Sequence, residues 1–590
     1  GLFYETDMRQ QQVDYNFEFN NTSLPQIRMY ASEEELSKMT LEHKITMRIK
    51  YTSTNTEKYG QSFDLPYCQV GWQGTSSIAY VLKNYQVYLK DENMADYLYT
   101  PFPNGVPEST FCFKADYMES SHSRNVGLAR LATDIIFADV KNPSQQENPK
   151  VRNSIDGFPV LLYINDELKG VYDFNTDRYS YKAWGYTNED TTLSYEISAN
   201  SDSTAGAFFP YDASTSGTTE LNYYKSDFMP IYPPTRVAGN DNYNEIKRLV
   251  DYVGKAEEDN FKDNFDKYFN KEYVFRYLIF VHLFGLVDNL GKNARLTSWD
   301  GLIWWFQPYD CDTCIALDNS GFQKFSSDIE IGDKNVFNTT SSKLWSKVML
   351  YFPNEIKQMY AQLRNGKLNL DNVLKYLIDE QLKKIPATMF NRDAQTKYLN
   401  FGETYLYACH GSSENLIKKW MSDRFKYMDS LYEYDTDNMD FITIRSSKMG
   451  KVYIDIQTFS PMYFTIKWRN EADNSGIKRQ RVGKGETVRF EYTMPTETDQ
   501  EIILYGGSNI KDLGDLSNLQ PTTLSIGNAT RLTNLVCHSS NLVNTDLSAC
   551  TNLVHVDLSK CTQLGSGVGS QSVLNLTKNP NLLYLNCQNT

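Results

Sequence analysis

The chain has 590 residues, a formal net charge of −14, 41% hydrophobic residues and nine cysteines. This length predicts roughly three to five domains with more than one core. The sequence has no basic stripe, which disfavours a nucleic-acid binder. No apolar run reaches about eighteen residues, which disfavours a membrane-spanning helix. The cysteines are few and odd in number, which disfavours a fold built on disulfides.

Residues 1–60 include the stretches VDYNFEFNN and HKITMRIKYTST, in which apolar and polar residues alternate. This alternation is typical of strands with one buried face. We expect a β-rich N-terminal arm or the edge of a preceding domain. The first residue is Gly1 and not Met, so we expect a processed chain or part of a longer polypeptide.

Residues 61–435 are predicted to form one α+β domain. CQVGWQG, LKNYQVYLK and STFCFKAD read as strands, and SSHSRNVGLARLATDIIF reads as a capped helix. FPVLLYINDELKGVYDF predicts a hairpin that turns on Asn165–Asp166. YVFRYLIFVHLFGLV (273–287) predicts a buried helix, and the strand pair that follows it turns at Trp299–Gly301.

Residues 436–508 predict a small β-sandwich, because five short alternating strands are separated by turns. Residues 509–590 contain leucines that recur every eleven residues, at Leu542, Leu553 and Leu564. This period predicts a leucine-rich solenoid in which Cys550 and Cys561 pack in the core. Solenoid ends need cover, so we expect the chain to continue beyond Thr590 or a subunit to cover that end.

Phosphoryl transfer needs phosphate-binding groups, metal ligands and a carboxylate that orients the attacking hydroxyl. The turn WQGTSS, with Gly74 and Ser76, follows a strand and offers backbone donors for phosphate. Lys83 and Lys114 are two candidates for the phosphate-binding lysine. Each pattern also has an ordinary explanation, since such turns are common in hairpins and lysines on strands are usually solvated.

The second half of this domain carries the acidic residues. Asp288 and Asn293 have the D-x-x-x-x-N spacing in which protein kinases place a catalytic Asp and a metal-binding Asn. Asp310 ends a strand 22 residues after Asp288, and Asp312 follows it. The sequence continues with Asp318 and Asn319, and carboxylate and amide oxygens suit a hard cation. The alternative is that these residues cap helices and turns, and that CDTC (311–314) supplies core thiols.

Five ordered blocks resemble the CotH kinase-like family, named for a spore-coat protein with an atypical protein-kinase fold: VGWQGTSSIAYVLKNYQVYL, FKADYMESSHSRNVGLARL, VLLYINDELKGVYDF, VDNLGKN and PYDCDTCIALDNSG. The resemblance covers about residues 60–430. It implies Asp288 as the catalytic carboxylate, Asp310, Asp312 and Asn293 as Mg²⁺ ligands, and Lys83 or Lys114 as the ATP-phosphate lysine.

Two positions depart from the protein-kinase pattern. The helix after Lys114 lacks an obvious Glu partner, because Glu119 precedes it and Asp134 ends it. Leu286–Val287 stand where His-Arg usually precedes the catalytic Asp.

The expected fold class is therefore α+β: a two-lobed kinase-like domain, a small all-β sandwich and a leucine-rich solenoid. The variant resembles those of large phage virion or bacterial surface proteins. This resemblance favours a structural or adhesive component of a virion or surface assembly, with neighbouring subunits and a host-surface ligand as partners and no nucleic acid. The alternative is an ATP- and Mg²⁺-dependent protein kinase that phosphorylates Ser or Thr of a surface or virion protein.

Overall fold

The computed structural model describes residues 24–197, 208–318, 321–331, 342–386, 390, 393, 413–434, 440–469, 476–496, 498–566 and 574–590. The chain divides into unit 1, Gly1–Ser422, and unit 2, Asp423–Thr590. The helix α17, Glu414–Leu431, crosses this division. Among the described residues, no helix combines the length and the apolar character that crossing a membrane requires.

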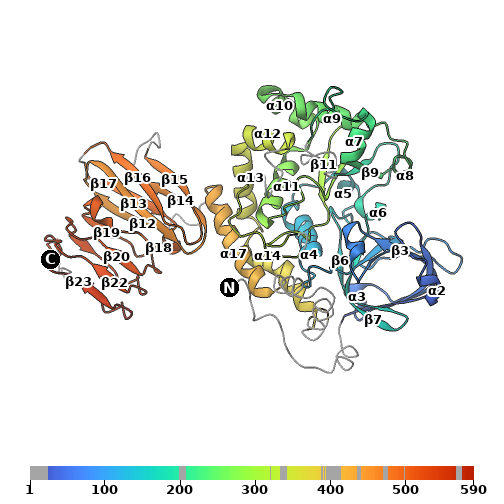
Figure 1. The fold of residues 1–590 in the computed structure, drawn as a ribbon, viewed down its shortest axis with the longest axis horizontal. Coiled ribbons are helices and arrows are strands. Elements are labelled where there is room, and N and C mark those ends of the chain that lie inside the picture. Colours follow the sequence, from blue (N-terminus) through green and yellow to red (C-terminus); the bar gives the residue numbers. More distant parts are fainter. Residues whose placement is uncertain are drawn as a thin grey trace. The chain divides into compact units, whose positions relative to one another are not determined.

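Seven strands of unit 1 close into a barrel, in the order β1-β2-β3-β4-β5-β7-β6. Figure 1 shows this region in blue and cyan, with β3, β6 and β7 labelled. Their bounds are β1 Gln26–Tyr30, β2 Ile45–Thr52, β3 Phe63–Gln73, β4 Asn84–Tyr88, β5 Thr110–Lys114, β6 Gly157–Ile164 and β7 Glu167–Thr176. In β2 the residues alternate strictly between buried and exposed, which is the pattern of a strand with one face on a core. The barrel closes because β1 runs parallel to β6.

The predicted turn at Asn165–Asp166 is confirmed. It joins β6 to β7, and both residues have positive φ angles, of 48° and 64°. Asn and Asp tolerate this left-handed conformation, which matches the twist of paired strands in two-residue hairpins.

Helices and a second sheet make up the rest of unit 1. The sheet has the order β11-β10-β8-β9, with β8 Leu193–Ile197, β9 Phe228–Tyr232, β10 Ala294–Ser298 and β11 Trp305–Pro308. The longer helices are α4 Arg124–Leu131, α7 Glu220–Asp227, α9 Asn244–Lys255, α10 Glu258–Asn264, α11 Lys271–Phe284, α12 Lys343–Tyr351 and α13 Pro353–Asn365.

Shorter helical segments connect these elements. They are α2 Glu33–Leu36, α3 Thr56–Tyr59, η2 Ser76–Ala79, η3 Ala132–Ile136, α5 Pro143–Glu147, α6 Tyr181–Trp184, α8 Pro234–Val237, η4 Phe265–Lys267, α14 Leu370–Leu374, η5 Lys375–Asp379 and η6 Leu382–Lys384. The predicted buried helix corresponds to α11, which is buried from Tyr273 to Phe284.

Unit 2 consists of short strands around one core. A six-stranded sheet has the order β15-β14-β17-β12-β19-β21, and two three-stranded sheets have the orders β16-β13-β18 and β20-β22-β23. The bounds are β12 Phe441–Ser446, β13 Gly450–Thr458, β14 Met462–Lys467, β15 Ile477–Val482, β16 Val488–Met494, β17 Gln500–Tyr505, η7 Gly507–Asn509, β18 Ile510–Asp512, η8 Leu516–Leu519, β19 Thr523–Ser525, β20 Asn534–Val536, β21 Asn544–Thr545, β22 His555–Asp557 and β23 Tyr584–Asn586.

The expected fold class was wrong in two respects. Unit 1 contains a closed seven-stranded barrel, which the expected two-lobed kinase-like domain did not include. The repeat does not form a separate leucine-rich solenoid. Its strand β19 pairs with β12 of the sandwich, and one continuous core runs from Ile442 to Cys561. The four domain boundaries expected from the sequence stay predictions.

Candidate active site

A buried helix positions Asp288. α11 ends at Phe284 and is capped by Gly285, whose φ of 61° lies in the left-handed region favoured by glycine. The following loop is tied back to the helix, because the Tyr277 hydroxyl donates a 2.5 Å hydrogen bond to the Asn289 carbonyl oxygen. Asp288 therefore stands on a short, anchored loop, and its side chain is 15% exposed.

Asn289 connects this loop to the end of β11. Its buried Nδ2 donates to the carbonyl oxygen of Asn293 at 3.1 Å and to that of Tyr309 at 2.9 Å. Asp310 follows Tyr309 with a φ of 53°. The two acidic segments that the sequence singled out are thus joined through a residue that it did not single out. The only signal for Asn289 was its place beside Asp288.

Lys114 forms an ion pair with Asp310. Its Nζ lies 2.6 Å from Oδ1 of Asp310, and the two side chains are 16% and 32% exposed. Burial lowers the pKa of Lys114, but the carboxylates of Asp310, Asp312 and Asp116 outweigh it and raise that pKa well above its usual range. Lys114 is therefore a permanently charged group beside the acidic residues.

Lys83, the other candidate lysine, has a different role. Its Nζ donates to the carbonyl oxygens of Ile78 at 2.6 Å and Tyr80 at 2.5 Å, and it lies 5.2 Å from the ring centre of Trp72. Lys83 thus binds the carbonyl oxygens at the C-terminal end of η2 and stabilises that turn. Of the two lysines, Lys114 is the one that the structure brings to the acidic residues.

Burial and the charge of Asp310 raise the pKa values of Asp312 and Asp288. Burial, followed by repulsion from Asp310, raises the pKa of Asp312 to about 8. Burial also raises the pKa of Asp288, while Lys292 at 3.4 Å opposes that rise and Asp310 adds to it. Crowded carboxylates of this kind are stabilised by a cation, and an all-oxygen donor set fits Mg²⁺. The carboxylates present thus fit the metal that the resemblance implies. Asn293 is joined to the end of β11 by its backbone, through Asn289.

The turn at Gly74 is held close to Lys114. Gly74 has a φ of 113°, and a Cβ atom there would collide with Oγ of Ser77. Asn84 links the turn to the barrel: its Nδ2 donates to Ser77 Oγ at 3.3 Å, and its Oδ1 accepts from the backbone nitrogen of Ala115 at 2.8 Å. Ser76 lies in η2, and its side chain is outside the described residues.

Helix α4 holds the loop that follows Asp310. Oδ1 of Asn125 accepts from the backbone nitrogen of Cys311 at 3.0 Å. The wholly buried guanidinium of Arg124 pairs with Glu119 at 2.8 Å and donates to the carbonyl oxygens of Cys314 and Ile315 at 3.0 and 2.8 Å. The missing Lys–Glu pair of the kinase pattern is thus replaced by direct contacts between α4 and the acidic loop, which the sequence analysis did not foresee.

The remaining predicted positions lie nearby. Cys311 and Cys314 are buried free thiols, and the Cys314 thiol lies 3.3 Å from the Cys311 carbonyl oxygen. Asp318 accepts from the backbone nitrogen of Phe322 at 3.0 Å, as a turn residue does. Asn319 lies outside the described residues.

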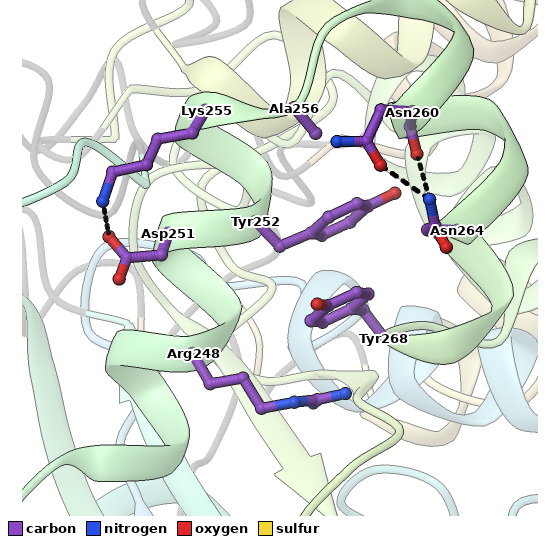
Figure 2. A pocket seen from close by; sticks show the side chains of 8 residues that line it. All are labelled: Arg248, Asp251, Tyr252, Lys255, Ala256, Asn260, Asn264 and Tyr268. Carbon is purple, nitrogen blue, oxygen red and sulfur yellow. Dashed lines mark hydrogen bonds and ion pairs between the residues drawn. The ribbon is translucent and has the colours of Figure 1, made fainter.

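A separate hollow of about 500 Å³ lies along α9 and α10 (Figure 2). The rings of Tyr252 and Tyr268 stack in it with centroids 3.9 Å apart, and Asp251 is paired with Lys255 at 2.9 Å. It contains no pair of neighbouring carboxylates, so it lacks the groups that phosphoryl transfer requires.

One comparison with known proteins matches the part of the chain that carries these residues. The family model described as "CotH kinase protein" matches residues 70–428, which include the Gly74 turn, Lys114 and the whole acidic group. A search of curated proteins found no match. Because the family match covers more than half of the sequence, the chain belongs to the CotH kinase protein family.

Proposed function

We propose that unit 1 catalyses ATP- and Mg²⁺-dependent transfer of a phosphoryl group to a hydroxyl group of a protein. The observation that carries the proposal is the 2.6 Å ion pair between Lys114 and Asp310, with Asp312 and Asp288 close enough to Asp310 for its charge to raise their pKa values. A lysine, a metal-binding carboxylate and a second carboxylate beside them are what this reaction needs.

Each residue has an assigned task. Asp310 and Asp312, together with Asn293, would hold Mg²⁺, which neutralises the phosphate charge when bound. Lys114, which is charged and paired with Asp310, would hold a phosphate oxygen of the nucleotide. Asp288 orients the attacking hydroxyl and accepts its proton. The hydrogen bond from Tyr277 anchors the loop that carries Asp288 and so fixes its position. Gly74 lets the turn approach the phosphates without a side chain in the way.

Nucleotide binding is the first test. MgATP at a hundred times its dissociation constant adds about 2.7 kcal/mol to the free energy of unfolding, which a thermal shift detects. Asp310→Asn should remove this shift, whereas Asp259→Asn, an exposed acidic residue on α10, should keep it. Absence of any shift in the unaltered protein at millimolar MgATP would refute the proposal.

A structural or adhesive role in a virion or at a cell surface is the second candidate. It is supported by exposed apolar side chains on unit 2: Leu583 is 86%, Tyr584 47% and Leu585 46% exposed, on or beside the sheet-edge strand β23. Such a patch is typical of a surface that contacts another protein. Sedimentation of the full chain tests it: self-association that Leu583→Glu abolishes supports the role, and a monomer at all concentrations argues against assembly through this face.

A further inference from the structure

Three buried side chains meet outside the barrel next to Lys114, adjoining the acidic site without including Asp288, Asp310 or Asp312. β5 pairs with β7 so that Phe113 lies opposite Phe174 and Lys114 lies opposite Asp173. The two phenylalanines belong to the barrel core. Because side chains alternate along a strand, Lys114 and Asp173 share the outer face. Asp116 and His122 join Asp173 there from the segment between β5 and α4.

The distances in this cluster are those of metal ligands. Nδ1 of His122 lies 3.4 Å from Oδ2 of Asp116 and 3.4 Å from Oδ2 of Asp173. A charge-assisted hydrogen bond would be about 2.7–2.9 Å long, so both contacts of Nδ1 are longer than such a bond, and one N–H shared between two oxygens makes only a weak bond to each. Donor atoms held about 2.0–2.1 Å from a tetrahedral Zn²⁺ lie about 3.3–3.4 Å from one another.

The burial and the charges of the three side chains also favour a bound metal ion. The side chains of His122 and Asp173 are 0% exposed and that of Asp116 is 1% exposed. Within the part of the chain that the structure describes, neither oxygen of Asp173 and neither ring nitrogen of His122 has a hydrogen-bond partner. His122 can carry only one positive charge opposite these two carboxylates, and buried carboxylates that are only partly neutralised are costly. A divalent cation among the three side chains neutralises both carboxylates and fills their coordination.

We propose that Asp116, His122 and Asp173 bind one divalent transition-metal ion, Zn²⁺ in the first place. An imidazole nitrogen with two carboxylate oxygens suits Zn²⁺ or Mn²⁺ better than Mg²⁺ or Ca²⁺, which prefer oxygen ligands alone. The ion joins the end of β5 to β7 and to the segment that leads into α4, so it fixes the backbone two residues from Lys114. The site does not depend on the proposed phosphoryl transfer.

Metal content tests the proposal directly. The full chain without an affinity tag is exposed to Zn²⁺, dialysed against metal-free buffer and analysed by plasma mass spectrometry. About one tightly held ion per chain is expected, as for other buried sites of this ligand type. Asp173→Asn and His122→Gln should lose this ion. Asp310→Asn is the matched control, because it removes a carboxylate of the neighbouring acidic site and should keep the ion.

A second measurement does not depend on the variants folding. Replacing the ion in the unaltered protein with Co²⁺ should give the visible absorption of a four-coordinate cobalt centre, and excess MgATP should not displace it. An unaltered chain that retains no Zn²⁺ and shows no cobalt absorption would overturn the inference, and the cluster would then be a proton-sharing network. Retention of the ion by Asp173→Asn would also overturn it. Failure of the proposed function would appear separately, as the absence of a MgATP-induced thermal shift.

Discussion

The outer face of the barrel in unit 1 and the sandwich core of unit 2 handle charge in opposite ways. Around Lys114 the structure buries Asp116, His122, Asp173 and Arg124. The core of unit 2 consists of apolar side chains and cysteines. Burying a charge is expensive unless it is paired or bound to a ligand. The buried charges beside Lys114 support the proposal that this face serves chemistry, whereas the sandwich core is apolar packing that holds unit 2 together.

The largest expected effect concerns Asp288. Asp288→Asn keeps the shape of the side chain but cannot accept a proton, so we expect ATP turnover to fall by about 10²–10⁴-fold. Initial rates of phosphoryl transfer at saturating MgATP measure this, while the thermal shift with MgATP should persist. Asp259→Asn serves as the control. A rate for Asp288→Asn close to that of the control would show that Asp288 does not accept the proton, and the charged face would then have no catalytic role through this residue.

The next effect concerns the apolar core of unit 2. Leu504 is 0% exposed, and Leu504→Ala should lower the free energy of unfolding of this unit by about 2–5 kcal/mol, because a cavity remains. Leu504→Met, which nearly conserves volume, should cost less than about 1.5 kcal/mol. Urea denaturation measures both. If Leu504→Ala also removed the response to MgATP, the two units would not be independent in the way the contrast assumes.

Glu108 gives unit 1 a pH dependence that the apolar core of unit 2 should not have. Burial raises the pKa of Glu108 from 4.5 to about 7, against the hydrogen bonds it accepts from the backbone. Between these values the folded protein holds a proton that the unfolded chain releases, so stability falls as the pH rises from about 4.5 to 7. The change amounts to at most about 3 kcal/mol.

Glu108→Gln should make this fall shallower by the part that Glu108 contributes, while the part due to other buried carboxyls such as Asp312 remains. Denaturation of unit 1 at several pH values tests it. An unchanged slope in Glu108→Gln would show that other groups account for the pH dependence.

The smallest effect is expected at an exposed ion pair of unit 2. Arg445 lies 2.5 Å from Asp499 and 3.2 Å from Glu501, with all three side chains more than 40% exposed. Because solvent screens such pairs, Arg445→Ala should change the free energy of unfolding by less than about 1 kcal/mol, and by less still in high salt. A larger loss would mean that charge also matters to the stability of unit 2.

Local features could be predicted from the sequence, because short-range chemistry determines them. The left-handed turn at Asn165–Asp166 and the buried helix α11 follow from residue type and spacing. The spacing of Asp288 and the strand-end position of Asp310 also placed them in one candidate site, and the structure couples their charges.

Long-range features could not be predicted, because no periodicity records them. The parallel pairing of β1 with β6 closes the barrel across a long stretch of sequence. The pairing of β19 with β12 merges the repeat into the sandwich. Likewise, strand pairing brings Asp173 to the cluster with Asp116 and His122. Lys83 donates to the carbonyl oxygens of Ile78 and Tyr80, and no sequence pattern records these contacts.

Closure of the barrel has a consequence for the order in which unit 1 folds. Gln26 of β1 pairs with Leu161 of β6, so a ribosome must release the whole stretch between them before the last strand pair can form. Contacts of such separation form slowly, because loop-closure entropy is lost before the contact stabilises the chain. Until then β1 and the outer strand of the unfinished sheet expose unpaired backbone groups, which makes this period the one in which the nascent chain most needs protection from aggregation.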